Sequence, residues 1–365
     1  MNPLKQLHKL GQSIWLDFFD REVMDSGQLQ KWIDEDDLAG ITSNPSIFES
    51  AVASGSDYDG DIKKLADSGK TGEEIFFGFA VKDIQRAADI LRPVYDAAKG
   101  NDGFVSLEVS PFLANDTEGT VAQALHLWEE VNRENVMIKI PGTKEGLEAI
   151  RQATAAGVNV NVTLLFGLDR YRAVTDAYLT GLEDRVARGE SIDGIKSVAS
   201  FFLSRIDVLL DPQLKAKGLT DLAGKAAIAS AKTAYQIYKE VFGSERFRKL
   251  EEKGARKQKV LWASTGTKNP EYSDVLYVET LIGENTINTL PVKTIDAFRD
   301  HGVAKSTLEE GMDTVKAQLE ALAANGIDLG KVSDELEKEG IEKFNVAFEK
   351  LLSAIKEKAG KVKVS

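Results

Sequence analysis

The sequence contains no cysteine, only three histidines and no long apolar run. Without cysteine, the chain cannot form disulfide bonds, use a thiolate in catalysis or bind a metal through cysteine ligands. The histidines are His8, His126 and His301, and because they are isolated from one another we expect no tightly bound transition metal. No stretch of about 18 uninterrupted apolar residues is present, and residues 1–12 lack the apolar segment of a signal peptide. We therefore expect a cytoplasmic protein with no membrane partner.

The chain is also short of positive charge, with 46 lysines and arginines against 58 acidic residues and a net charge of −12. Proteins that bind nucleic acid usually present a basic surface, so we expect no nucleic-acid partner. No GxGxxG or GxxxxGK[ST] motif follows any predicted strand, which argues against a dinucleotide or nucleotide cofactor. We expect no cofactor, small-molecule partners, and a monomer or homodimer.

What the sequence does contain is a regular alternation of short apolar segments and helical patterns. The predicted strands are 13–19, 38–45, 104–111, 136–141, 157–166, 195–204, 260–265 and 286–291. Such alternation is typical of a parallel sheet, and eight units favour a (β/α)₈ TIM barrel over a doubly wound sheet. We assign residues 1–365 to one α/β domain with additional helices. A helical extension is predicted from about residue 306, with residues 356–365 disordered.

One lysine interrupts the predicted strand Val136–Pro141, whose other residues are all apolar. A buried ammonium without a partner is strongly disfavoured, so Lys139 either pairs with a carboxylate or sits uncharged. An uncharged amine at the mouth of a pocket can form a Schiff base with a carbonyl compound. The alternative is a structural lysine that pairs with an acid or extends to the end of the strand.

Other polar residues fall near the carboxyl ends of the predicted strands, where barrel enzymes place their catalytic groups. They are Asp17, Asn44, Glu108, Asn161 and Thr163. Each has a structural alternative: Asp17 could cap a helix, Asn44 could open an Asn-Pro turn, and the amides and hydroxyls could form a hydrogen-bonded layer. Together with Lys139 they suit a site that cleaves a sugar, because Glu108 and Asp17 could move the protons that carbonyl chemistry requires.

A second group of residues, after the sixth and seventh predicted strands, could bind a phosphate. Ser200, Arg205 and Lys268 lie where barrels often place a phosphate site. For Arg205, an ion pair with a neighbouring acid such as Asp207 is the alternative.

Several of these residues lie in segments that resemble the transaldolase family. Thr42-Ser43-Asn44-Pro45-Ser46 resembles its Thr-x-Asn-Pro-Ser signature, and Val136–Pro141 resembles its Schiff-base segment. Asn159–Phe166 is similar to the family's Asn-x-Thr-Leu-Leu-Phe strand, and Ser200–Ile206 to its phosphate-binding segment. The similarity extends in unbroken order from Asp17 to about Pro291.

The resemblance implies a transferase of the pentose phosphate pathway that moves a dihydroxyacetone unit between sugar phosphates. It would interconvert sedoheptulose 7-phosphate plus glyceraldehyde 3-phosphate with erythrose 4-phosphate plus fructose 6-phosphate. By the resemblance, Lys139 is the nucleophile, and Glu108 and Asp17 are the acid/base pair. The residues that would contact the substrate are Asn44, Asn161, Thr163, Ser200 and Arg205. The chain departs from the family after the seventh predicted strand, where Lys268 stands in for an arginine.

Two other functions are compatible with these residues. A class I aldolase would use the same lysine but release its products instead of transferring the carbon unit. A barrel kept as a binding or scaffold module would have lost turnover, although the intact lysine and both acids argue against that.

Overall fold

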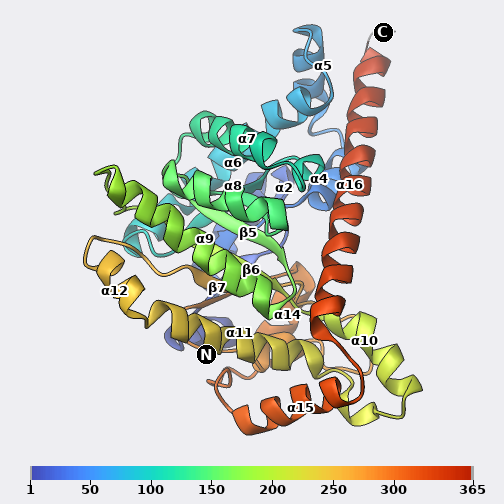
Figure 1. The fold of residues 1–365 in the computed structure, drawn as a ribbon. Helices are drawn as coiled ribbons and strands as arrows, with labels where there is room; N and C mark the ends of the chain where they lie inside the picture. Colours follow the sequence, from blue (N-terminus) through green and yellow to red (C-terminus); the bar gives the residue numbers. More distant parts are fainter. Residues whose placement is uncertain (1, 363–365) are drawn as a thin grey trace.

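Eight parallel strands close into a barrel in the computed structural model, which describes residues 2–362 (Figure 1). Neighbouring strands follow chain order around the barrel, and β8 pairs with β1 to close it. The strands are β1 (Gln12–Leu16), β2 (Leu38–Ile41), β3 (Phe104–Glu108), β4 (Val136–Pro141), β5 (Val160–Leu165), β6 (Ser197–Phe202), β7 (Lys259–Ala263) and β8 (Thr286–Leu290). The predicted (β/α)₈ fold is confirmed, with each predicted strand present.

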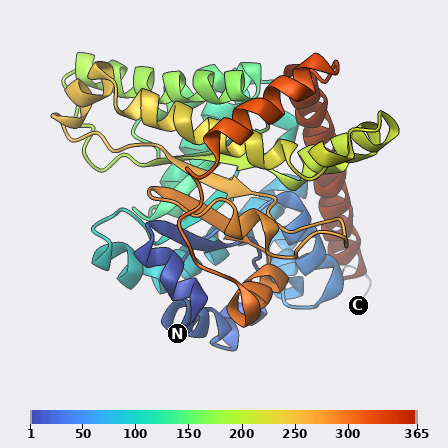
Figure 2. The ribbon, with the colours of Figure 1, turned by 90° about the horizontal axis from the view of Figure 1, so that it is seen from below.

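The helices surround the barrel and cover its carboxyl-terminal end (Figures 1 and 2). They are α1 (Pro3–Lys9), α2 (Arg21–Asp25), α3 (Gln28–Asp36), α4 (Pro45–Ser54), α5 (Asp59–Asp67), α6 (Gly72–Ala97), the 3₁₀ turn η1 (Pro111–Leu113), α7 (Thr117–Val131), α8 (Lys144–Ala155), α9 (Leu168–Ala187), α10 (Ser204–Ala216), the 3₁₀ turn η2 (Thr220–Leu222), α11 (Ala226–Phe242), α12 (Glu245–Glu251), α13 (Leu276–Glu279), α14 (Val292–His301), α15 (Met312–Ala324) and α16 (Leu329–Val362). Among residues 2–362, none of these helices has both the length and the apolar composition needed to cross a membrane.

Seven of the eight predicted strands end earlier in the structure than in the sequence-based assignment, and the first and sixth are examples. The first ends at Leu16, so Asp17 lies just beyond β1 and not within it. The sixth ends at Phe202, and Ser204 already begins α10, which places Arg205 in the first turn of a helix. Both predictions extended the strand because apolar residues continue past its hydrogen-bonded part.

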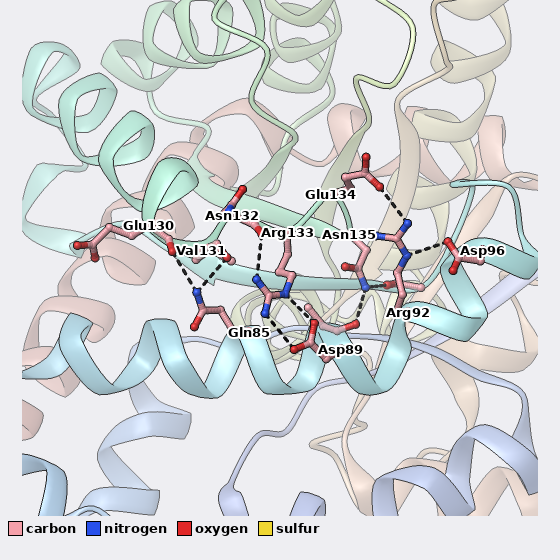
Figure 3. Close-up of polar contacts among 12 residues, drawn as sticks. Gln85, Asp89, Arg92, Asp96, Glu130, Val131, Asn132, Arg133, Glu134 and Asn135 are labelled. Carbon is pink, nitrogen blue, oxygen red and sulfur yellow. Dashed lines mark hydrogen bonds and ion pairs between the residues drawn. The ribbon is translucent and has the colours of Figure 1, made fainter.

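The turn before β4 is held in place by polar contacts with α6 (Figure 3). Asn135 is fully buried, and its Nδ2 donates hydrogen bonds to the carbonyls of Ala88 (2.8 Å) and Gly103 (3.0 Å). Arg133 forms a two-pronged ion pair with Asp89, at 2.6 and 3.0 Å. These contacts tie the start of β4 to α6 and β3, and they set the register that brings Lys139 to its neighbours.

The carboxyl-terminal extension is helical, as predicted, but its predicted disorder is wrong for residues 356–362. α16 continues through Val362, and its own residues Leu351 and Ile355 are fully buried. Lys358 of this helix pairs with Asp59 of α5 at 2.6 Å. Residues 363–365 lie outside the described part of the chain, and the assignment of residues 1–365 to one domain stays a prediction.

Candidate active site

A cavity of about 200 Å³ lies at the carboxyl ends of the strands. It is lined by Asp17, Thr42, Asn44, Lys139, Ser200, Phe202, Arg205, Ala263, Ser264, Gly266, Lys268, Thr289, Pro291 and Phe344. Six of the nine site residues predicted from sequence are in this lining, and the other three, Glu108, Asn161 and Thr163, lie behind it. The fold therefore brings together residues that lie far apart in the sequence, such as Asp17 and Lys268, in one cavity.

Strand register explains why the central residues meet. Glu108 on β3 is the direct register partner of Lys139 on β4, and Lys139 is the direct partner of Asn161 on β5. Register partners on adjacent strands point to the same face of a sheet, so all three side chains are directed into the barrel. A shift of one residue in β4 would turn Lys139 outward toward the helices.

Lys139 is almost completely enclosed, with 5% of its surface exposed. Its Nζ lies 3.2 Å from Oε2 of Glu108 and donates a hydrogen bond of 3.1 Å to the carbonyl of Ser43. Of the two states that the sequence left open, the structure therefore has the lysine paired with a carboxylate. Neither oxygen of Glu108 has another hydrogen-bond partner in the described chain, so the carboxylate is directed at the amine alone.

Both acidic residues have perturbed proton affinities. Burial raises the pKa of Glu108, and the nearby charge of Asp17 raises it further, although Lys139 acts in the opposite direction. Burial also raises the pKa of Asp17, while Lys139 and a hydrogen bond from Thr42 lower it. A raised pKa makes a carboxylate a better proton acceptor, which suits a group that takes up and returns protons in acid and base catalysis.

The alternative of a helix cap is wrong for Asp17. The residue that caps α2 is Asp20, whose Oδ1 accepts a hydrogen bond from the backbone N–H of Val23 (2.8 Å). Asp17 instead accepts a hydrogen bond of 3.2 Å from the hydroxyl of Thr42 and faces the cavity. Thr42 in turn contacts the hydroxyl of Thr289 at 2.7 Å, which links the ends of β2 and β8 around the acid.

The amide oxygen of Asn44 has a structural role as a helix cap. Its Oδ1 accepts a hydrogen bond from the N–H of Ile47 (3.1 Å) and caps α4, as the Asn-Pro turn alternative predicted. The same side chain lines the cavity, and the cap uses only its oxygen, so Nδ2 remains a donor for a bound molecule.

Beneath the cavity, Asn161 lies in a chain of hydrogen bonds inside the barrel. Ser200 Oγ donates to Asn161 Oδ1 (2.7 Å), and Asn161 Nδ2 donates to Ser106 Oγ (2.9 Å). The hydrogen-bonded layer offered as an alternative for Asn161 is thus present, while Ser200 also reaches the cavity. Thr163 is different: its hydroxyl is buried and has no hydrogen-bond partner in the described chain, which leaves it available for water or substrate.

Arg205 does not form the predicted alternative ion pair with Asp207. The carboxylate of Asp207 instead accepts hydrogen bonds from the hydroxyl of Tyr277 (2.7 Å) and the N–H of Ala227 (2.9 Å). The Arg205 guanidinium lies 5.7 Å from the centre of the Phe202 ring, and its Nη1 is buried without a hydrogen-bond partner. Burial lowers its pKa, against the opposing charges of Glu339 and Asp17.

Lys268 lies at the exposed edge of the same cavity. Besides Lys139, the cavity lining therefore has two cations, the half-buried Arg205 and the exposed Lys268, together with Ser264. A guanidinium that has an unpartnered nitrogen can attract an anion, and a phosphate can accept two of its hydrogen bonds at once.

Comparison with known proteins agrees with this site. The family model described as "Transaldolase/Fructose-6-phosphate aldolase" matches residues 14–355. The chain belongs to this family. A transaldolase of Trichodesmium erythraeum is 46% identical over 99% of this chain and 98% of its own length. Transaldolases of Thiobacillus denitrificans and an Arthrobacter species are 47% and 48% identical, over 97% of this chain and 100% and 96% of their own lengths. The predicted membership of the transaldolase family, and with it an enzyme, is confirmed.

Some cavity residues of this family member were missed by sequence reasoning. Thr42 lines the cavity but was not among the predicted site residues, although it belongs to the Thr42–Ser46 motif that also contains Asn44. Phe202, Ser264 and Thr289 lie near the ends of predicted strands, so their proximity to the cavity could have been inferred from barrel topology. Phe344 carried no such signal because it lies on a helix far beyond the last strand.

Proposed function

We propose that the chain is a transaldolase that carries a dihydroxyacetone unit on Lys139 as a Schiff base. The observation that supports this most directly is an enclosed lysine 3.2 Å from a buried carboxylate, facing a cavity that also contains a second acid and an unpaired arginine. The proposed substrates are ketose and aldose phosphates, with sedoheptulose 7-phosphate plus glyceraldehyde 3-phosphate exchanged for erythrose 4-phosphate plus fructose 6-phosphate.

Glu108 is proposed to transfer protons to and from the Lys139 amine and the carbinolamine, because it is the acid in contact with Nζ. Lys139 passes a proton to Glu108, and the free amine then attacks the carbonyl carbon of the bound ketose. The carbinolamine that forms takes a proton on its oxygen and loses water, which leaves the Schiff base. The raised pKa of Glu108 suits this exchange, since the carboxyl group can hold the proton until the carbinolamine needs it.

Asp17 is proposed to act on the substrate, because it lines the cavity while Glu108 lies behind it. As a carboxylate it takes the proton of the hydroxyl on the far carbon of the bond to be broken, and that carbon becomes the aldehyde carbon of the leaving aldose. The carbon–carbon bond then breaks, its electrons move toward the iminium nitrogen, and an aldose leaves an enamine on Lys139. An acceptor aldose enters, the enamine carbon bonds to its aldehyde carbon, Asp17 returns the proton, and hydrolysis releases the new ketose.

The remaining residues are proposed to hold the substrate. Arg205 and Lys268 would bind its phosphate, because they are the cations of the cavity lining beside Lys139. Hydroxyl groups of the sugar would be held by Asn44 and Ser200 directly, with Asn161 and Thr163 acting from the layer behind them. The place in the pentose phosphate pathway, the cytoplasmic location and the state as monomer or homodimer stay predictions.

The experiment that tests this proposal is trapping of the Schiff base. Borohydride reduction in the presence of fructose 6-phosphate should add a stable three-carbon group to the peptide containing Lys139 and abolish activity. Lys139→Gln should give no adduct and no transfer. Lys196 provides the internal control, since it is also a largely buried lysine and lies directly before β6. An adduct on Lys196 or Lys144, with Lys139 unmodified, would contradict the assignment.

The class I aldolase remains the second candidate, because the family's description includes fructose-6-phosphate aldolase. Both reactions form the same enamine and differ only in its fate. Incubation with fructose 6-phosphate and erythrose 4-phosphate separates them: a transaldolase yields sedoheptulose 7-phosphate, whereas an aldolase yields free dihydroxyacetone at the same rate with and without the acceptor.

A further inference from the structure

One wall of the cavity comes from the last helix of the chain. α16 contacts α4, η1 and α10, and these elements follow the carboxyl ends of β2, β3 and β6. It also contacts β5 itself. Figures 1 and 2 both show α16 in red as a long rod along one side of the molecule, and it packs against α4, α5 and α6. The helix therefore crosses the end of the barrel at which the cavity opens.

A glycine allows α16 to approach the barrel closely. A Cβ atom placed on Gly340 would lie 3.0 Å from Cδ2 of Leu164 and 3.6 Å from Nη1 of Arg205. Leu164 has a left-handed backbone with φ of +59°, at the place where the β5–β6 pairing shifts its register. The side chain at the end of β5 thus meets the helix backbone, and no side chain at position 340 separates the helix from the site.

Phe344, four residues and about one helical turn after Gly340, faces the cavity. Its side chain is 5% exposed, and the centre of its ring lies 6.0 Å from Nζ of Lys139. The ring is thus an apolar wall across from the amine that would carry the enamine. Phe202 is the other aromatic residue of the cavity lining, but it contacts the Arg205 guanidinium.

The helix is anchored on both sides of Phe344 by other residues. Leu336 precedes it with 3% exposure, and Phe348 follows with 1%. The Phe348 ring packs against Phe76 and Phe112, at 5.4 and 5.3 Å between centres. Since these contacts hold α16 in place, we expect the helix to stay docked when the ring of Phe344 is removed.

We propose that Phe344 is a specificity-determining residue that keeps water away from the enamine on Lys139 and so favours transfer over release. This inference rests on the proposed function. An enamine reached by water takes a proton from it at carbon and becomes an iminium ion. A second water then adds to the iminium carbon and displaces the amine, which releases dihydroxyacetone and regenerates Lys139. An apolar ring over the amine leaves no polar partner for a water at that place, which disfavours this route.

The test compares the two fates of the enamine in one reaction. The full chain is incubated with fructose 6-phosphate and erythrose 4-phosphate in heavy water, and sedoheptulose 7-phosphate is measured against free deuterated dihydroxyacetone. Phe344→Ala should raise the ratio of release to transfer by about tenfold, the effect of ~1.4 kcal/mol in the competition. Phe344→Leu, which keeps an apolar side chain, should lie between Phe344→Ala and the unmodified protein.

Val346→Ala is the matched control, because Val346 lies on the same helix with 44% of its surface exposed. Its ratio should equal that of the unmodified protein. An unchanged ratio in Phe344→Ala and Phe344→Leu, even with lower kcat, would overturn the inference and leave the proposed function intact. Release without any transfer by the unmodified protein would instead overturn the proposed function. The ratio is measured only on enzyme that turns over, so reduced folding of one variant does not change it.

Discussion

Replacing Arg205 by alanine should weaken the reaction of phosphorylated sugars and leave the fold intact. Arg205 is half-buried and lines the cavity, its Nη1 has no hydrogen-bond partner in the described chain, and Asp207 is occupied by Tyr277 and Ala227. We therefore expect the guanidinium to bind the substrate phosphate. A hydrogen bond to a charged group contributes roughly 1.5–3 kcal/mol, so Arg205→Ala should lower kcat/KM for fructose 6-phosphate about ten- to a hundred-fold.

Although Arg205→Ala should lower activity, it should not lower the free energy of unfolding. The half-buried guanidinium has lost water at Nη1 without gaining a hydrogen bond there, which raises the free energy of the folded state, so its removal costs mainly the contact with the Phe202 ring. The free energy of unfolding of Arg205→Ala should equal or exceed that of the unmodified protein, as measured by urea denaturation. An arginine kept for structural reasons would give a clear loss instead.

The assay measures kcat/KM for two donors, fructose 6-phosphate and fructose, with erythrose 4-phosphate as the acceptor. Both values are measured for the unmodified protein and for Arg205→Ala. Arg205→Ala should lower kcat/KM for cleavage of fructose 6-phosphate and leave kcat/KM for cleavage of fructose nearly unchanged. Arg172→Ala is the control, since Arg172 is an exposed arginine paired with Glu240, and it should change neither value. An equal proportional loss for both donors would refute the phosphate contact.

Three further predictions follow from the geometry. Glu108→Gln and Asp17→Asn should each lower kcat by about 10²–10⁴-fold in a transfer assay, and full activity in both would show that the carboxylates are structural. Burial raises the pKa of Asp207 from 3.8 to about 6. A raised pKa means that the folded state binds the proton more tightly, so this group's stabilisation is complete below pH 3.8 and is lost as the pH rises through about 6. Asp207→Asn should therefore gain stability relative to the unmodified protein by roughly 3 kcal/mol between about pH 4 and pH 8 in urea denaturation, and a constant difference would contradict this. Asn135→Ala should lower the free energy of unfolding by about 1–3 kcal/mol, because two buried carbonyls lose their donor, and an unchanged urea midpoint would show that water replaces it.

The architecture and six residues of the cavity lining were predictable from the sequence. Strand and helix periodicity are local, and eight strand–helix units have one common way to bury their apolar faces, the closed parallel barrel. Because all strands of that barrel end at the same rim, polar residues at their carboxyl ends had to meet. That rule alone brings Asp17, Lys139 and Arg205 into one cavity.

How deep each residue lies and what it contacts depend on the packing of segments that are distant in the sequence. Register between β3 and β4, held by distant contacts such as that of Asn135, made Glu108 the partner of Lys139. The pairing of Asp207 with Tyr277 left Arg205 without the acid that its sequence neighbourhood suggested. The contribution of Phe344 depends on where a helix packs that begins at Leu329, well after the last strand. Local patterns specify which faces are apolar, but contacts between distant segments depend on how the whole chain fills its core.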